Sequence, residues 1–254
     1  MPMLRLAVLS LVISSSASPA HAESIDGTAE PAIVAHAPAS DDAFTPGLAP
    51  AAGHGRAITT GVVAWNGASD KTSVDLNGEV NVFGPVRLVL RVDNVFDSAR
   101  PGIGAAVQWL REAKHGVSSS AYFVYKAEGF SEPEGELEAL VAFGKQLGPV
   151  HGTLNVAYGQ DPEGNERDGE AALGLHIEPI HGLFTGVIGR YRDALGSDGD
   201  KSTKIVRDVL GGATATYVVG SFGVTATAGI AGVETTTTSM QTGATAALSV
   251  GAVF

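Results

Sequence analysis

Residues 243–254 read GATAALSVGAVF, and the side chains along this stretch alternate between two kinds. Every second residue from Ala244 to Phe254 is apolar, whereas the residues between them, from Gly243 to Val253, are mostly small or polar. Successive side chains of a β-strand point to opposite faces. The stretch therefore predicts a strand whose two faces meet different media.

The same alternation extends upstream in runs of about ten residues, the pattern expected of transmembrane strands. In the run from Val74 to Val82, apolar residues alternate with Asp75, Asn77 and Glu79. An apolar outer face and a polar inner face predict an all-β fold, a closed antiparallel transmembrane β-barrel over residues 57–254. Twelve strands are expected, near residues 57–66, 72–82, 86–96, 102–110, 117–128, 135–146, 150–158, 169–179, 182–193, 206–218, 222–233 and 242–254.

The connections between these runs fall into two alternating kinds. Short ones resemble each other, as in FGPVR at 83–87 and LGPVHG at 147–152. Longer polar ones lie between them, as in QDPEGNERDG at 160–169 and LGSDGDKSTK at 195–204. Short periplasmic turns and longer extracellular loops are typical of outer-membrane barrels. An even strand number would place both ends of the barrel on the periplasmic side.

Residues 99–116, ARPGIGAAVQWLREAKHG, leave an alternative open. Ile103, Val107 and Leu110 also fit a helical stripe, and REAK is a good helix former. If this piece is a helix, the barrel has ten strands and a plug or periplasmic helix.

The first 56 residues do not share the alternation. Residues 1–22 combine Arg5, the apolar run LAVLSLVI and the small-x-small site Ala20-His21-Ala22, which predicts a cleaved secretory signal peptide. The apolar run is less than half the roughly 20 residues that a spanning helix needs. Residues 23–56, rich in Ala, Pro, Asp and Gly, are expected to form a disordered periplasmic linker.

Composition excludes several classes of function. The formal net charge is −11, and removal of Arg5 with the signal peptide makes it −12, so nucleic acid is not an expected partner. The chain has no cysteine, which excludes disulfides, thiol chemistry and cysteine-based metal sites. No zinc pattern, phosphate-binding loop or nucleophile elbow is present, and no cofactor is predicted.

The C-terminal ALSVGAVF with its terminal Phe254 resembles the C-terminal signature of bacterial outer-membrane β-barrel proteins, a porin-like class. Together with the signal peptide and the alternating connections, the resemblance covers residues 57–254. It implies an outer-membrane location, contact with outer-membrane lipid, and assembly by periplasmic chaperones and the barrel-insertion machinery, with Phe254 as the insertion signal. It identifies no family within the class.

The strand parity points charges of both signs into the barrel. One interpretation is a wet, charged channel, and the other is a lumen filled by cross-strand ion pairs, such as Lys126 with Glu136 or Glu138, and Glu79 with Arg87 or Arg91. The predicted lumen-lining residues are Asp75, Glu79, Arg87, Arg91, Lys126, Glu136, Glu138, Glu170, His176 and Arg190.

Three functions follow from this interior. The leading one is a passive pore for small solutes, with a mild cation preference because inward carboxylates outnumber inward bases. The first alternative is a closed-lumen structural or interaction protein of the outer membrane. The second is a barrel enzyme acting on lipid or peptide, which would need a serine or carboxylate near His176 in space. No catalytic residue and no metal site is predicted. His151 and His181, at equivalent places in two PxHG turns, are expected to belong to turn or interface structure rather than to catalysis.

Overall fold

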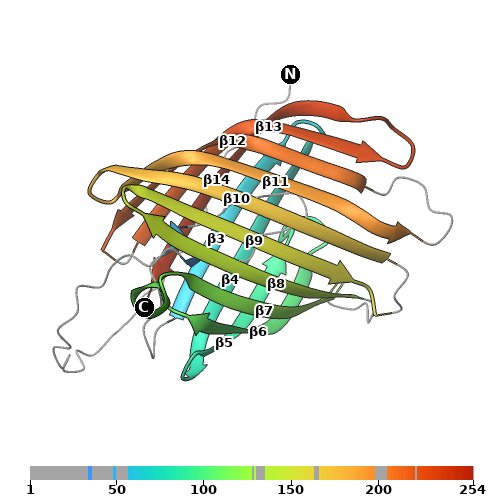
Figure 1. Cartoon of the computed structure of the whole chain (residues 1–254). Helices are drawn as coiled ribbons and strands as arrows, with labels where there is room; N and C mark the ends of the chain where they lie inside the picture. Colours follow the sequence, from blue (N-terminus) through green and yellow to red (C-terminus); the bar gives the residue numbers. More distant parts are fainter. Residues whose placement is uncertain are drawn as a thin grey trace. The chain divides into compact units, whose positions relative to one another are not determined.

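The computed structural model describes residues 34–35, 48–49, 57–127, 129, 135–162, 166–197, 205–220 and 222–253. Almost all of these residues lie in strands (Figure 1). The long strands are β3 (Ala57–Asn66), β4 (Lys71–Phe83), β5 (Val86–Asp93), β6 (Arg100–Leu110), β7 (Ser118–Ala127), β8 (Gly135–Leu147), β9 (Val150–Gln160), β10 (Glu166–Ile180), β11 (Leu183–Ser197), β12 (Ile205–Val219), β13 (Phe222–Thr235) and β14 (Gln241–Val253).

These strands form one closed barrel in which each pairs antiparallel with its neighbours in sequence. The seam is the pairing of β14 with β3, which runs from Thr245 opposite Asn66 to Val253 opposite Ile58. The predicted twelve-stranded barrel is confirmed. Closure leaves no strand edge unpaired, which is the condition for a sheet in a lipid bilayer.

The ten-strand alternative for residues 99–116 is wrong. Most of the segment is β6, which pairs with β5 and β7, and only Glu112–His115 forms a helix, α1. The helix stops after one turn at Gly116, whose φ of 72° lies in the left-handed region. A helix over the whole segment would remove the partner that β5 and β7 each have on one side, so sheet closure outweighs the helical propensity of REAK.

The two ends of the barrel differ in their connections. One end, here called the turn end, has connections at 84–85, 148–149, 181–182 and 220–221, together with the segment that holds α1. Gly84 and Gly148 adopt positive φ there, which explains why the FGP and LGP segments recur in sequence. The opposite end, the loop end, carries the longer connections. The first residue of β3 and the last residue of β14 both lie at the turn end.

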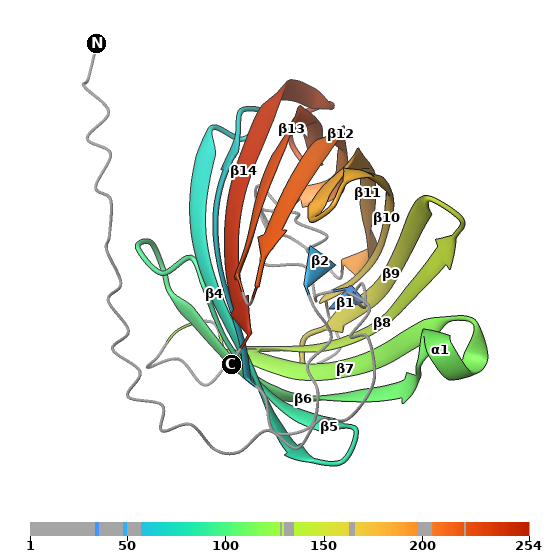
Figure 2. The same ribbon diagram turned by 90° about the vertical axis from the view of Figure 1, so that its left-hand side faces the viewer.

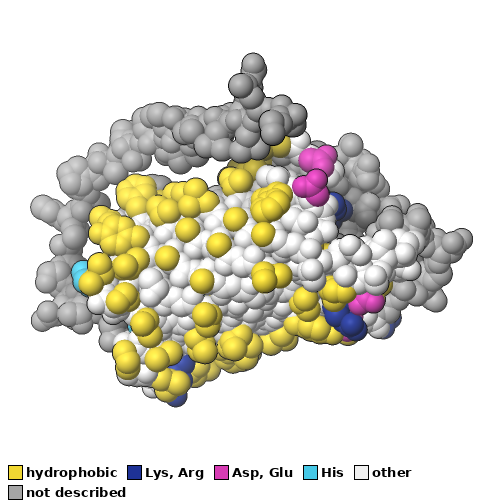
Figure 3. Space-filling model, turned by 90° about the horizontal axis from the view of Figure 1, so that it is seen from above, with side chains coloured by type: hydrophobic (Ala, Val, Ile, Leu, Met, Phe, Trp, Pro, Cys, Tyr) yellow, Lys and Arg dark blue, Asp and Glu magenta, His cyan; other side chains and the backbone are white. Residues whose placement is uncertain are grey.

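The outer face of the barrel is apolar. Figure 3 shows hydrophobic side chains along the wall, with the charged side chains toward its two ends. Exposed aromatic residues lie near both strand ends, with Trp65, Tyr158 and Tyr191 toward the loop end and Phe83, Tyr217 and Phe222 toward the turn end. Two such girdles are expected at the two interfaces of a membrane. The one helix in the described part of the chain is too short to cross a membrane.

Two short strands precede the barrel, β1 (Val34–Ala35) and β2 (Leu48–Ala49), and they pair with each other. β1 lies against β8 and β9, while β2 lies against β13 on a different wall, so the pair lies inside the ring of strands (Figure 2). The remainder of the predicted linker, the whole predicted signal peptide and Phe254 fall outside the described residues.

Candidate functional site

The inner face of the barrel is the candidate site, because strand parity collects the polar residues there. On β5, for example, Arg87, Val89, Arg91 and Asp93 are buried in the interior, whereas Leu88 and Leu90 are exposed on the outside. All of the predicted lumen-lining residues point inward, as their alternation indicated. They are Asp75, Glu79, Arg87, Arg91, Lys126, Glu136, Glu138, Glu170, His176 and Arg190.

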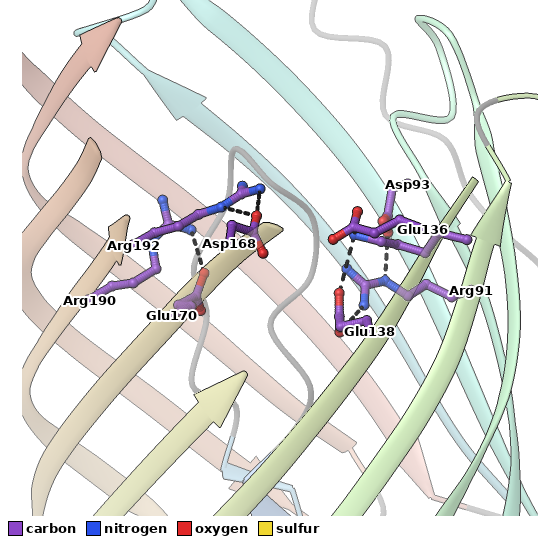
Figure 4. A network of polar contacts seen from close by, with 9 residues as sticks. Arg91, Asp93, Glu136, Glu138, Asp168, Glu170, Arg190 and Arg192 are labelled. Atoms are coloured by element: carbon purple, nitrogen blue, oxygen red, sulfur yellow. Dashed lines mark hydrogen bonds and ion pairs between the residues drawn. The ribbon is translucent and has the colours of Figure 1, made fainter. Parts of the chain in front are cut away.

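One ion-pair network joins β5, β7 and β8 toward the loop end (Figure 4). Lys126 Nζ lies 3.0 Å from Glu136 Oε2 and 3.2 Å from Glu138 Oε2. Arg91 donates from Nη1 to Glu138 Oε1 at 3.1 Å and from Nε to Asp93 Oδ1 at 2.8 Å. Glu138 therefore links two bases on different strands, and the predicted pairing of Lys126 with Glu136 and Glu138 is confirmed.

A second network lies on β10, β11 and β12, also toward the loop end (Figure 4). Arg190 pairs with Asp208, and its Nη1 lies 4.0 Å from Glu170 Oε2. Arg192 Nε donates to Asp168 Oδ2 at 2.8 Å. Asp168 was expected in a surface loop, but β10 begins at Glu166, so the side chain lies on the strand.

A third ion pair lies near the turn end, and buried apolar side chains separate it from the charges toward the loop end. Arg87 Nη1 donates to Glu79 Oε2 at 2.6 Å, which is one of the two pairings predicted for Glu79. The Arg87 guanidinium carbon lies 5.8 Å from the centre of the Tyr122 ring. Along β5, Val89 separates this pair from Arg91. Val89 belongs to a buried apolar cluster of interior side chains that also contains Ala106, Tyr122, Val124, Leu140 and Ala142.

The wall formed by β13, β14 and β3 is almost uncharged. These three strands carry a single charged residue, Glu234, near the loop end of β13. Their inner face, with that of β12, combines hydroxyl groups with apolar side chains, which include the buried Ile58, Val62 and Ala64 of β3. Thr216 and Thr225 hydrogen-bond at 2.9 Å, and Thr227 donates to Thr214 at 3.3 Å. The interior thus has a charged side and an almost uncharged side.

Carboxylates outnumber bases on the inner face. Among buried or half-buried inward residues of the described strands, nine are acidic and six are basic, a difference of three negative charges. The acidic residues are Asp75, Glu79, Asp93, Glu136, Glu138, Asp168, Glu170, Glu178 and Asp208, and the basic ones are Arg87, Arg91, Arg100, Lys126, Arg190 and Arg192.

The two PxHG histidines are not equivalent, which corrects the prediction. His181 lies in a turn and is exposed, whereas His151 is the second residue of β9 and is buried in the interior. Its parity with the inward Thr153 and Asn155 was the sequence signal that could have shown this. His176 is also buried, and neither of its ring nitrogens has a hydrogen-bond partner in the described part of the chain. A His176–carboxylate relay is therefore not formed.

Sequence reasoning missed Asp208 entirely, although it is the partner of Arg190. Residues 198–204 connect β11 to β12 and lie outside the described residues. Asp208 shares the strand parity of the inward Thr214 and Thr216, and this parity was the sequence signal that could have found it. Across the described residues, no group of three or more potential metal ligands is found.

Comparison with known proteins connects the fold to a class of channels. No protein-family model matches the sequence, and no curated protein matches it. An outer membrane channel from Pseudomonas putida F1 has a TM-score of 0.54 at 12% identity, with 80% of this chain and 97% of that chain covered. The NanC porin has a TM-score of 0.51 at 7% identity, with 76% and 98% covered.

The outer membrane channel DcaP of Acinetobacter baumannii has a TM-score of 0.44 at 10% identity, and 73% of this chain is covered. This chain spans 63% of the length of DcaP. The similarity to the first two structures shows a shared fold. The barrel therefore has the porin-like architecture of outer-membrane channels, as the C-terminal resemblance implied.

Proposed function

We propose that the chain forms a passive pore for small solutes in a bacterial outer membrane. The apolar outer wall with its two aromatic girdles fits a bilayer, and the polar inner face fits a route for hydrated solutes. The proposal includes export through a signal peptide cleaved after Ala22, periplasmic chaperones, and the insertion machinery that would read Phe254. Outer-membrane lipid is then the partner of the exposed apolar side chains.

The acidic excess of the inner face carries the proposed selectivity. Charged side chains that line a pore select ions by their field. The two networks near the loop end neutralise most of this field internally, because each base lies against a carboxylate. A residual excess of three carboxylates supports a mild preference for cations rather than a strong one.

The experiment is the reversal potential of the mature chain, residues 23–254, in planar bilayers across a KCl gradient. Wild type should show mild cation preference. Glu136→Gln/Glu138→Gln should shift it toward anions, because Lys126 and Arg91 then lose carboxylate partners. Glu234→Gln, a half-buried carboxylate on the outward parity, should leave selectivity unchanged. Anion preference of the wild type would overturn the proposal.

One observation favours the closed-lumen alternative. The β1–β2 pair lies inside the barrel against β8, β9 and β13. A mature chain that is folded by its β-sheet circular dichroism but passes no current would identify a structural or interaction protein. A barrel enzyme has no comparable support, since His176 has neither a serine nor a carboxylate partner among the described residues.

A further inference from the structure

Two histidines face each other across neighbouring strands inside the barrel. His151 on β9 and His176 on β10 are direct partners in the antiparallel register. Side chains of directly opposite residues on one face of a sheet have Cβ atoms about 4.5–5.5 Å apart. Both point inward, because the neighbours of His176 along the chain, Leu175 and Ile177, are exposed on the outer face. The two imidazoles therefore share one small region of the inner wall, near the turn end.

The polar atoms of His176 are unusual for a buried side chain. The residue is 1% exposed, and both Nδ1 and Nε2 lack a hydrogen-bond partner in the described part of the chain. A buried polar group that makes no hydrogen bond costs free energy, so such a group requires an explanation. A bound ligand that accepts the lone pair of a His176 ring nitrogen would explain the missing hydrogen bond of that nitrogen.

The surroundings hold the two rings in place. His151 meets Phe184 edge to face, with ring centroids 5.4 Å apart and an interplanar angle of 84°. A Cβ built on Gly174 would lie 2.9 Å from His176 Cε1 and 2.6 Å from Thr153 Oγ1, so the glycine leaves the space that the His176 ring occupies. Gly186, the partner of His176 on β11, adds no side chain to the region.

We propose that His151 and His176 form a binding site for a transition-metal divalent cation, such as Zn²⁺, Cu²⁺ or Ni²⁺, inside the turn end of the barrel. Imidazole nitrogen suits these ions, whereas Mg²⁺ and Ca²⁺ prefer oxygen ligands. Glu178 is not a third ligand, because its Oε1 accepts from the Gly182 N–H at 2.7 Å and lies 3.4 Å from His181 Nδ1. Water completes the coordination, so the ion is exchangeable.

The test is metal binding by the untagged mature chain, refolded in detergent. The parent carries His36→Asn and His54→Asn, and every variant is made in that background. Calorimetric titration should show Zn²⁺ binding and no matching Mg²⁺ binding. His151→Asn and His176→Asn should each weaken Zn²⁺ binding at least about tenfold, the smallest loss seen when even an outer-shell partner is removed. His181→Asn, an exposed histidine at the same end, is the control and should bind as the parent does.

A second readout tests the site in the parent chain, before any substitution of His151 or His176. Electron paramagnetic resonance of bound Cu²⁺ in the parent chain should show hyperfine coupling to two equatorial imidazole nitrogens, and to one in whichever single variant folds. Equal Zn²⁺ affinity of His176→Asn and the parent, or a Cu²⁺ spectrum with no imidazole coupling, would overturn the proposal.

Discussion

The Glu79–Arg87 pair shows what single residues contribute to this interior. Its side chains are 0% and 6% exposed, and the contact is 2.6 Å. Removing one member of a buried pair leaves the other charge poorly compensated, which typically costs about 3–5 kcal/mol. Arg87→Ala should therefore lower the free energy of unfolding by about 3 kcal/mol or more, as measured by urea titration in phospholipid vesicles.

The matched control is a pair with the opposite parity. Arg207 and Glu234 have side chains that are 41% and 34% exposed, with a contact of 3.3 Å. Because solvent screens exposed ion pairs and they contribute little to stability, Arg207→Ala should have little effect. Equal losses of unfolding free energy in the two variants would mean that the buried Glu79–Arg87 contact stabilises the barrel no more than the exposed pair does. The double variant Glu79→Gln/Arg87→Met should recover part of the loss.

Sequence predicted residue pairs where two neighbouring strands both carry charges on their inner parity. Glu79 and Arg87 lie on the inner parity of β4 and β5, and parity left Arg91 as a second possible partner of Glu79. Lys126 and Glu136 are direct partners in the β7–β8 hairpin. Asp208 was missed although it shares the inner parity of Thr214 and Thr216 on β12. The His151–His176 pairing was not predicted, because the PxHG segment indicated a turn at His151, where the structure has the second residue of β9.

Among the elements, β12 and β13 face each other through two glycines that leave no room for a side chain. Gly212 and Gly229 are direct partners, and a Cβ on Gly229 would lie 2.2 Å from the Gly211 carbonyl oxygen. Gly229→Ala should push the strands apart and destabilise the barrel by about 1–3 kcal/mol, the usual cost of overpacking. The urea midpoint in vesicles reports this loss.

Gly211→Ala is the control for that prediction. The position is on the same strand pair, but a Cβ there has nothing within 4 Å. Its urea midpoint should match that of wild type. If Gly229→Ala were as stable as Gly211→Ala, the close approach of these strands would not restrict the side chain.

Alternation predicted that each of the twelve strands exists but not where the longest ones end. β10 covers Glu166–Ile180 and β11 covers Leu183–Ser197, longer than the expected 169–179 and 182–193. The added residues, such as those at 166–168, are polar and resemble loop sequence. They are strand because they pair across the hairpin, a tertiary effect that composition does not record. The same effect decided β6, whose two neighbours required a partner.

At the scale of the whole molecule, the apolar outer wall defines a slab that the bilayer should fill. Leu173 lies in the middle of β10 and is 51% exposed, whereas Leu195 is near the loop end of β11 and is 60% exposed. Arginine on the lipid face costs about 2–4 kcal/mol at the midplane and about 0–1 kcal/mol near the interface. Leu173→Arg should thus destabilise the barrel in vesicles far more than Leu195→Arg.

Detergent provides the contrast for that pair of variants. A micelle adapts its thickness to the protein, so the difference between the two positions should shrink there. Equal urea midpoints for the two variants in vesicles would mean that the described wall does not sit across the bilayer with Leu173 near its centre.

The seam between β14 and β3 has a consequence for the order of events in biogenesis. Thr245 Oγ1 donates to the Trp65 carbonyl oxygen at 2.8 Å across 180 residues of chain. β3 precedes β14 in the chain by the whole length of the barrel, so the backbone groups on its seam side stay unpaired until β14 is in place. Any chain interrupted before β14 has two open edges instead of none. Completion of the barrel therefore depends on β14, the thirteen-residue strand that pairs with both β13 and β3.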